Sequence, residues 1–233
     1  MQRIPTVAAV IQPEKPAPIA VGISSCLLGA EVRYNGGHSR SRLCSDRLSK
    51  YFAFRSFCPE VAAGLGTPRP TLRLVGDPVS PRLEPSAGGD DVAERLLQAS
   101  QSTLESAAQL DGYILMKNSP SCGMERVKVY QANGHPHTQR REGLFAAALR
   151  ERWPLLPIEE EGRLHDARLF ENFVLRVFVH HRFRTLVLAE PSLAALMAFH
   201  RDHKYLLMAH DVRSYRVLGR MLAEHRASDA MAQ

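Results

Sequence analysis

The chain has 233 residues, 45% of them hydrophobic, with a formal charge of +6 at pH 7 and a pI near 9.4. A chain of this length can bury one good hydrophobic core, alone or with a small appended unit. No run of about 18 apolar residues occurs, so a membrane-spanning helix is not expected. Four unevenly spaced cysteines without a secretion signal argue against a disulfide framework and indicate the reducing cytoplasm. The basic charge permits a polyanionic partner but does not by itself indicate one.

The first 162 residues alternate between short apolar runs and amphipathic segments. Residues 1–18 contain four prolines and no apolar signal core, so we expect a flexible leader. Apolar and β-branched runs predict strands at 19–24, 54–57, 71–75, 113–116, 127–130 and 155–158. Helices are predicted at 46–52, 90–109 and 142–153, with a surface loop at 78–89 and a turn at 134–137. This order of elements indicates an α/β domain over residues 19–162, with a mainly parallel, Rossmann-like sheet flanked by helices.

The last third of the chain has a different pattern, because apolar residues recur at helical spacing from Asp166 onwards. We expect a connecting helix over residues 163–188 and a short, all-helical C-terminal extension over residues 189–233. His200 and His203 are three residues apart, a spacing that zinc can use, but no carboxylate–histidine motif accompanies them. A solvated helix face is therefore the preferred interpretation. The arginines and histidines between residues 176 and 226 suit a phosphate backbone.

Three of the four cysteines, Cys26, Cys58 and Cys122, follow predicted strands. The carboxyl ends of neighbouring strands in an open α/β sheet converge on one crevice, so the three thiols are expected to meet there. Thiolates select iron-sulfur clusters and zinc over hard cations, although the spacing here matches no CxxC knuckle. Each of the three lies among Gly, Pro or Ser in a turn, which favours a ligand over a buried structural thiol. Cys44 lacks such neighbours and is interpreted as non-ligating.

Several short motifs, taken in chain order, indicate a resemblance to a known protein family. They are Cys26-Leu27-Leu28-Gly29, Arg33-Tyr34-Asn35-Gly36, Cys58-Pro59-Glu60 with Gly64-Leu65-Gly66 and Pro68-Arg69-Pro70, and Ser119-Pro120-Ser121-Cys122-Gly123. Together they resemble the TudS-like thiouracil desulfidase family over residues 19–161. Residues 160–164 resemble the end of that domain, and residues 200–210 resemble the start of the helical domain fused to it in RudS-type tRNA desulfidases. Fewer residues follow position 188 than that fused domain normally has, so we expect its RNA-binding function to be reduced or lost.

The resemblance implies a [4Fe-4S] cluster held by Cys26, Cys58 and Cys122, with the fourth iron open to the substrate sulfur. An open iron acts as a Lewis acid toward a thiocarbonyl sulfur, and net desulfuration by water needs no electrons. A base must then activate the water. Glu60, two residues from Cys58, is the best placed carboxylate by sequence, with helix capping as its alternative role.

Five further residues are candidates for the site. Ser119 and Ser121 can donate to the pyrimidine or to the cluster sulfurs, or can simply cap the backbone. Tyr34 and Asn35 are candidates for contacting the base, but the family commonly has Asp where this chain has Asn35, and an asparagine cannot act as a base. Arg69 lies between two prolines on a rigid turn, where it binds a phosphate or pairs with an acid.

With these residues, the resemblance implies an iron-sulfur-dependent, non-redox desulfidase. Its first expected substrate is 4-thiouridine in tRNA, which it would convert to uridine with release of sulfide, a hydrolytic reaction. One alternative is the same chemistry on free thiouracil or a thionucleoside. A second alternative, from another class, is a non-catalytic RNA-binding module whose cysteines hold zinc. No membrane or DNA partner is expected.

Overall fold

The computed structural model describes residues 18–231, with side chains described as far as residue 225. The leader predicted for residues 1–18 therefore lies outside the described residues, apart from its last position. Within the described part of the chain, no helix is both long enough and apolar enough to cross a membrane.

The central sheet has four strands, all parallel, in the order β2-β1-β5-β8. Its strands are β1 (Ile19–Ser24), β2 (Phe52–Phe57), β5 (Gly112–Leu115) and β8 (Ile158–Glu160). The register pairs the last residue of β1, Ser24, with the last residue of β2, Phe57. The chain therefore leaves these strands at one edge of the sheet, and the predicted parallel sheet is confirmed.

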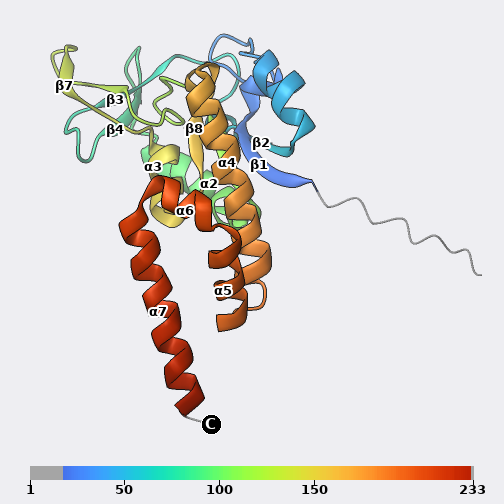
Figure 1. The fold of residues 1–233 in the computed structure, drawn as a ribbon. Coiled ribbons are helices and arrows are strands. Elements are labelled where there is room, and N and C mark those ends of the chain that lie inside the picture. The colour runs from blue at the N-terminus through green and yellow to red at the C-terminus, as the bar shows by residue number, and fades with distance from the viewer. Residues whose placement is uncertain (1–17, 232–233) are drawn as a thin grey trace, which may run out of the picture.

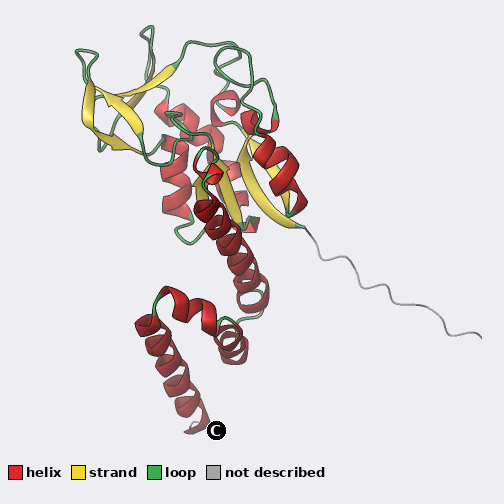
Figure 2. Ribbon diagram, turned by 45° about the horizontal axis from the view of Figure 1, so that its top comes forward, coloured by secondary structure: helices red, strands yellow, loops and turns green. Residues whose placement is uncertain are grey.

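A second sheet, in the order β4-β3-β6-β7, stands apart from the first, as the two groups of yellow arrows in Figure 2 show. Its strands are β3 (Leu72–Val75), β4 (Arg82–Pro85), β6 (Val127–Tyr130) and β7 (Pro136–Arg141). The sequence predicted β3 and β6 as strands, but it did not predict that they leave the main sheet. The predictions of a loop at 78–89 and a turn at 134–137 are wrong where β4 and β7 form. Those strands depend on antiparallel pairing with β3 and β6, which no local pattern displays.

Helices cover both faces of the central sheet (Figure 1). They are α1 (Pro59–Ala62), α2 (Ala93–Ser106), α3 (Leu144–Arg152) and α4 (Ala167–Phe183). Alternate residues of β5 enter two different cores. Tyr113 and Leu115 pack with α2 and α3, whereas Ile114 packs with Phe173 of α4. Because the two inner strands, β1 and β5, are buried on both sides, they read as continuous apolar runs.

Short 3-10 or π-helical turns complete the domain. They are η1 (Ser25–Leu28), η2 (Leu43–Arg47), η3 (Leu48–Lys50), η4 (Ala107–Gln109), η5 (Arg163–His165) and η6 (Arg184–Leu188). The helix predicted at 46–52 is wrong in its extent, because η2 and η3 replace it and β2 already begins at Phe52. Phe52 is buried and pairs with Ile19, so sheet pairing overrides the local helical pattern.

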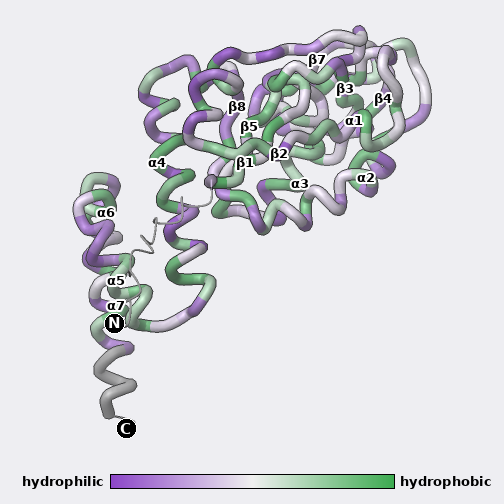
Figure 3. Tube along the Cα trace, turned by 90° about the vertical axis from the view of Figure 1, so that its right-hand side faces the viewer, coloured by the Kyte–Doolittle hydropathy of each residue, from purple (hydrophilic) through white to green (hydrophobic). Residues whose placement is uncertain are grey.

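The C-terminal third is helical, as predicted. After η6 it forms α5 (Leu193–Asp202), α6 (Lys204–His210) and α7 (Val212–Met231), which lie apart from the α/β body in Figure 3. His203 corrects the expected solvated face, because it is only 6% exposed and stacks on Phe199 with ring centroids 3.9 Å apart. His200 stacks in the same way on Tyr215.

A buried carboxylate fastens α4 and η6 to the α/β body. Asp111 is fully buried and accepts hydrogen bonds from His180, His181 and Arg184, with donor–acceptor distances of 2.8 to 3.0 Å. Burial alone would raise the pKa of Asp111, but the hydrogen bonds from Arg184, His180 and His181 outweigh it and lower this pKa well below its usual range. The carboxylate is therefore ionised in the folded protein at neutral pH.

Candidate functional site

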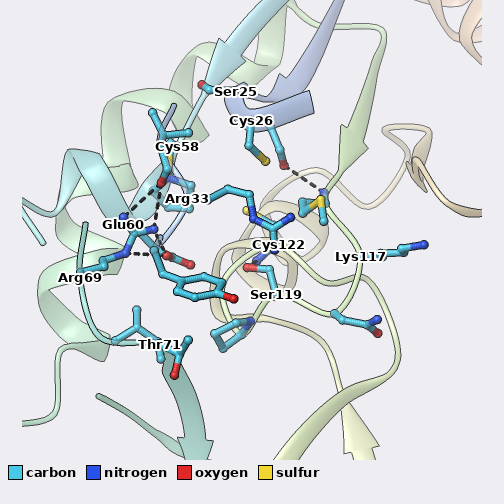
Figure 4. A pocket seen from close by; sticks show the side chains of 18 of the residues that line it. Ser25, Cys26, Arg33, Cys58, Glu60, Arg69, Thr71, Lys117, Ser119 and Cys122 are labelled. Carbon is cyan, nitrogen blue, oxygen red and sulfur yellow. Dashed lines mark hydrogen bonds and ion pairs between the residues drawn. The ribbon is translucent and has the colours of Figure 1, made fainter. Parts of the chain in front are cut away.

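A cavity of about 440 Å³ opens at the edge of the central sheet where β1, β2 and β5 end. Figure 4 shows the side chains that line it. The lining residues that can carry chemistry are Cys26, Arg33, Tyr34, Cys58, Glu60, Arg69, Thr71, Lys117, Asn118, Ser119 and Cys122. The cavity thus combines three thiols, one carboxylate and three cations in one place.

The chain conformation after each strand explains why the three thiols converge. Cys26 lies in η1, directly after β1, and this turn ends at Gly29, whose φ of +99° favours glycine. Cys58 is the first residue after β2 and occupies the N-cap of α1. Cys122 lies in the loop after β5, in a turn closed by a hydrogen bond from the Gly123 N–H to the Ser119 carbonyl. All three thiols line the same cavity.

The fourth cysteine lies elsewhere. Cys44 is fully buried in the core beneath α4, with Leu43, Leu48 and Phe173 in the same apolar cluster. It is absent from the residues that line the cavity.

Burial disfavours the charged form of every pocket cysteine. It raises the pKa of Cys26 to about 11, with the neighbouring Cys58 sulfur adding to the effect. The same desolvation raises the pKa of Cys58 and, most strongly, that of Cys122. Thiolates at these positions therefore need a positively charged partner, and a metal centre supplies one.

Glu60 is held in one orientation by two neighbours. Its Oε1 accepts a hydrogen bond of 2.9 Å from the Ser121 hydroxyl, and its Oε2 forms an ion pair with Arg69. The Arg69 Nε donates to Oε2 over 3.0 Å, and other guanidinium nitrogens donate to the carbonyls of Val32 and Gly66. Both side chains are mostly buried, 5% exposed for Arg69 and 14% for Glu60. Of the two roles expected for Arg69, the structure displays the pairing with an acid.

Of the remaining predicted site residues, Ser119 and Tyr34 line the cavity, whereas Asn35 does not. The Ser119 hydroxyl oxygen accepts from the backbone N–H groups of Ser121 and Cys122, so it caps the loop and also lines the cavity. Tyr34 lines the mouth and is 41% exposed. Asn35 is exposed, does not line the cavity, and accepts a hydrogen bond from the Gly37 N–H.

Sequence reasoning missed two cations and an amide. Arg33, Lys117 and Asn118 all line the cavity. Arg33 hydrogen-bonds the Ser39 hydroxyl and lies over the Tyr34 ring, with its guanidinium carbon 5.8 Å from the ring centroid. A signal was available for Lys117, because a polar residue immediately after a buried strand marks the ligand-binding edge of a parallel sheet.

One buried polar atom near the cysteines has no hydrogen-bond partner. The Tyr113 hydroxyl is fully buried, and Tyr113 packs in the same core cluster as Cys122. Burial raises the pKa of Tyr113 well above its usual range, and the sulfurs of Cys122 and Cys58 add to this. A buried hydroxyl without a partner is costly, whereas a thiolate or sulfide beside it would accept its hydrogen bond.

The soft donors at the cavity are three cysteine thiols. In the part of the chain that the structure describes, no three His, Cys, Asp or Glu side chains form a group that could hold one metal ion. The three thiols instead surround a shared cavity. Three thiolates, a buried donor at Tyr113 and space between them suit an iron-sulfur cluster, which is held by Cys thiolates and tuned by hydrogen bonds to its sulfurs.

Fold and pocket together define an α/β protein with a cysteine-lined cavity at the carboxyl edge of a parallel sheet. The chain belongs to the 2-thiouracil desulfurase family, whose model matches residues 21–161. It is 35% identical over 108 residues to the uncharacterized protein YbbK of Bacillus subtilis (strain 168), covering 43% of this chain and 71% of that protein. A solved structure described as the [4Fe-4S]-dependent thiouracil desulfidase TudS is 28% identical, with a TM-score of 0.48, and the match covers 66% of this chain and 98% of that one.

Proposed function

We propose that this protein is a non-redox desulfidase that acts on a thiolated uracil, first of all 4-thiouridine in tRNA. Water supplies the oxygen that replaces sulfur, and the sulfur leaves as hydrogen sulfide, so atoms balance without an oxidant or reductant. The observation that carries the proposal is a single cavity with three thiols and a fixed carboxylate, in a chain of the 2-thiouracil desulfurase family. The four free cysteines are consistent with a reducing cytoplasm as its location.

Cys26, Cys58 and Cys122 would hold a [4Fe-4S] cluster. When bound, such a cluster supplies an iron without a protein ligand, which polarises the thiocarbonyl as a Lewis acid. The observations that support this assignment are the three thiols around one cavity and the unpartnered, buried Tyr113 hydroxyl in the core cluster that also contains Cys122.

Glu60 would act as the general base. A carboxylate offers about four lone-pair sites, and Ser121 occupies only one on Oε1, so this oxygen can still accept a proton from water. The ion pair with Arg69 fixes the other oxygen and keeps the carboxylate aimed at the cavity. Ser121 and Arg69 are therefore positioning residues for Glu60, each of which acts through it.

Other residues would bind the pyrimidine. The Ser119 oxygen accepts from two backbone N–H groups, and its own hydroxyl proton can be donated to an oxygen of the base. Tyr34 presents an exposed ring at the mouth on which a base can stack, while Asn35 holds the turn that carries it. The cations Arg33 and Lys117 would favour the negative charge that develops as water attacks the ring.

The choice of substrate can be tested directly. Protein reconstituted with iron and sulfide without oxygen is incubated with thiolated tRNA, with 4-thiouridine and with free 2-thiouracil, and loss of the thiocarbonyl absorbance is followed. We expect the fastest loss with thiolated tRNA. Rapid turnover of the free base with no turnover of tRNA would assign the alternative substrate class.

The metal content tests the second alternative. Anaerobically purified protein should be brown and contain iron and acid-labile sulfide. A colourless protein with stoichiometric zinc would reject the enzyme and favour a zinc-containing RNA-binding module.

A further inference from the structure

The three C-terminal helices, α5, α6 and α7, form an arm (residues 193–231) that lies apart from the α/β body in Figure 3. Among the described side chains of these helices none is buried, although each helix carries several large apolar residues. By contrast, α4 buries Phe173 and Val177. Most of the stability of a helix in a protein comes from packing its apolar face, so a single copy of the arm leaves that packing incomplete.

One face of α7 is covered by α5. Gly219 lies so close to α5 that an added Cβ would be 3.4 Å from a carbon of the His200 ring. The His200 ring stacks on Tyr215, and its Nε2 donates to the Tyr215 carbonyl over 3.3 Å. These contacts fix which side of α7 faces the rest of the arm. Figure 1 shows α7 as the outermost helix of the molecule, so its other side is open.

The open side of α7 carries an apolar stripe, Val217, Leu218 and Met221, which are 40%, 44% and 59% exposed. Residues three and four positions apart lie side by side on a helix, so these side chains form one patch. Arg213 and Glu224 flank the stripe, one toward each end of the helix. They are eleven residues apart, which is about three turns, so they lie on the same face.

The two flanking charges have no partner within the arm. Arg213 and Glu224 are exposed, and neither takes part in an ion pair among the described residues. A stripe with a cation at one end and a carboxylate at the other is complementary to a second copy of itself that runs in the opposite direction. Homodimers are most often two-fold symmetric, so that the same patch of each copy meets the other.

A two-fold axis near position 218 satisfies every group on this face. It sets a second α7 antiparallel to the first and brings Arg213 of each copy opposite Glu224 of the other. Val217, Leu218 and Met221 of the two copies then cover one another in the middle. With 20 residues, α7 is about 30 Å long, which is enough to hold the stripe and both charge pairs.

The charges of the arm argue against a polyanion on this stripe. The cations Arg216 and Arg220 line a different cavity, between α5 and α7, together with His200 and Tyr215. A phosphate backbone would be attracted to that side of α7. The stripe itself is apolar and has a carboxylate at one end.

We propose that α7 is a dimerisation helix, in which the stripes of two copies pack together around a two-fold axis and Arg213 of each copy pairs with Glu224 of the other. The proposal concerns the assembly of the protein and does not depend on the reaction proposed above. Because α7 contributes no residue to the thiol-lined cavity, each copy keeps a complete site.

Charge reversal in the full chain tests the pairing. Arg213→Glu and Glu224→Arg each place like charges opposite one another at both ends of the interface, so each variant alone should self-associate several-fold more weakly than wild type in sedimentation equilibrium. An equimolar mixture of the two variants should recover the wild-type association. In the mixed dimer the introduced glutamate meets the introduced arginine, and the native pair remains at the other end.

The apolar stripe is tested by Met221→Glu, which should leave the protein monomeric because it places a charge in the middle of the interface. Leu155→Glu is the matched control, since Leu155 is 79% exposed on the α/β body, and it should associate as wild type does. Circular dichroism shows whether each variant keeps its helices. A wild type that stays monomeric at about 100 μM, or a mixture that associates no better than the single variants, would overturn the proposal. Loss of tRNA binding in Met221→Glu, with wild type monomeric, would assign the stripe to nucleic acid and overturn it as well.

Discussion

The Ser121 hydroxyl donates a 2.9 Å hydrogen bond to Glu60 Oε1 and so joins the loop after β5 to the helix that follows β2. Each of these residues is one or two positions from a cavity cysteine, Cys122 or Cys58. The contact therefore fixes the position of the candidate base relative to two of the three thiols. A shift of either loop would move both the base and a cysteine of the proposed metal centre.

Glu60→Gln is expected to retain iron and lose turnover, because an amide can accept the Ser121 hydrogen bond but cannot take a proton from water. Ser121→Ala should retain the Glu60 carboxylate but remove the hydrogen bond that orients it. We expect a smaller loss of rate than in Glu60→Gln, and a loss of about 1 to 3 kcal/mol of stability. Initial rates and iron content measured on both variants check this. An active Glu60→Gln enzyme would remove Glu60 as the base.

Cys26→Ala, Cys58→Ala and Cys122→Ala are each expected to lose iron and acid-labile sulfide, because each removes a thiolate from the shared cavity. Cys44→Ala is the matched control. It should keep its iron and lose only about 1 kcal/mol of stability, since it opens a small void in the core beneath α4. Loss of iron from the Cys44 variant would make Cys44 a ligand and contradict the assignment of the other three.

Gly143→Ala is expected to disturb the Cys122 loop. A Cβ at position 143 would lie 2.5 Å from the Ser121 carbonyl and 2.9 Å from the Cys122 backbone nitrogen, so backbone would have to move. We expect a lower melting temperature together with reduced iron occupancy. Gly36→Ala, in an open turn with a positive φ, should cost some stability and leave iron occupancy unchanged. Full occupancy in Gly143→Ala would mean that the loop tolerates displacement.

Asp111→Asn is expected to loosen α4 and η6. Removing one partner from a buried ionic cluster costs about 3 kcal/mol near pH 7. The hydrogen-bonded network lowers the pKa of Asp111, so its contribution is complete above the unfolded carboxyl pKa of about 3.9 and declines as the pH falls below that value. Urea unfolding at pH 7, 5 and 3.5 should show the gap between wild type and variant shrink only at the lowest pH. Asp77→Asn, in an exposed turn, is the control and should change the free energy of unfolding little. If the difference in stability between wild type and Asp111→Asn did not vary with pH, Asp111 would not be the group that titrates.

Tyr113→Phe is expected to have different effects on the metal-free protein and on the protein with a bound cluster. Without metal, the variant loses a buried hydroxyl that has no partner, so its stability should be unchanged or higher by about 1 kcal/mol. With a cluster bound, the same change removes a buried hydrogen-bond donor from the core cluster that contains Cys122 and should shorten the lifetime of the cluster absorbance in air. Equal lifetimes for wild type and variant would place the hydroxyl out of reach of the centre.

Much of the fold was predictable because the signals for it are local. The strand at 19–24 was predicted with its observed bounds, and the strand at 127–130 likewise, since a buried strand is a short apolar run between turn residues. The division of the strands between two sheets was not predictable. It depends on whether β3 and β6 pair with β1 or with each other, and those pairings join residues far apart in the chain.

For the site, the sequence by itself determined the set of candidate residues. They are three cysteines, Glu60, Arg69 and two serines, in turns that follow strands or precede a strand. These follow from residue type, from their place beside predicted strands and from the resemblance to the desulfidase family. Only the tertiary structure decided that Arg69 pairs with Glu60, that Asn35 turns away from the cavity, and that Lys117 and Arg33 face it. The physical reason is that ion pairs and cavity walls join side chains from separate loops, and the central sheet's register brings those loops together. A cavity of about 520 Å³ is of the same kind, because β3, β6 and the loop after β5, which are far apart in the chain, form its wall together.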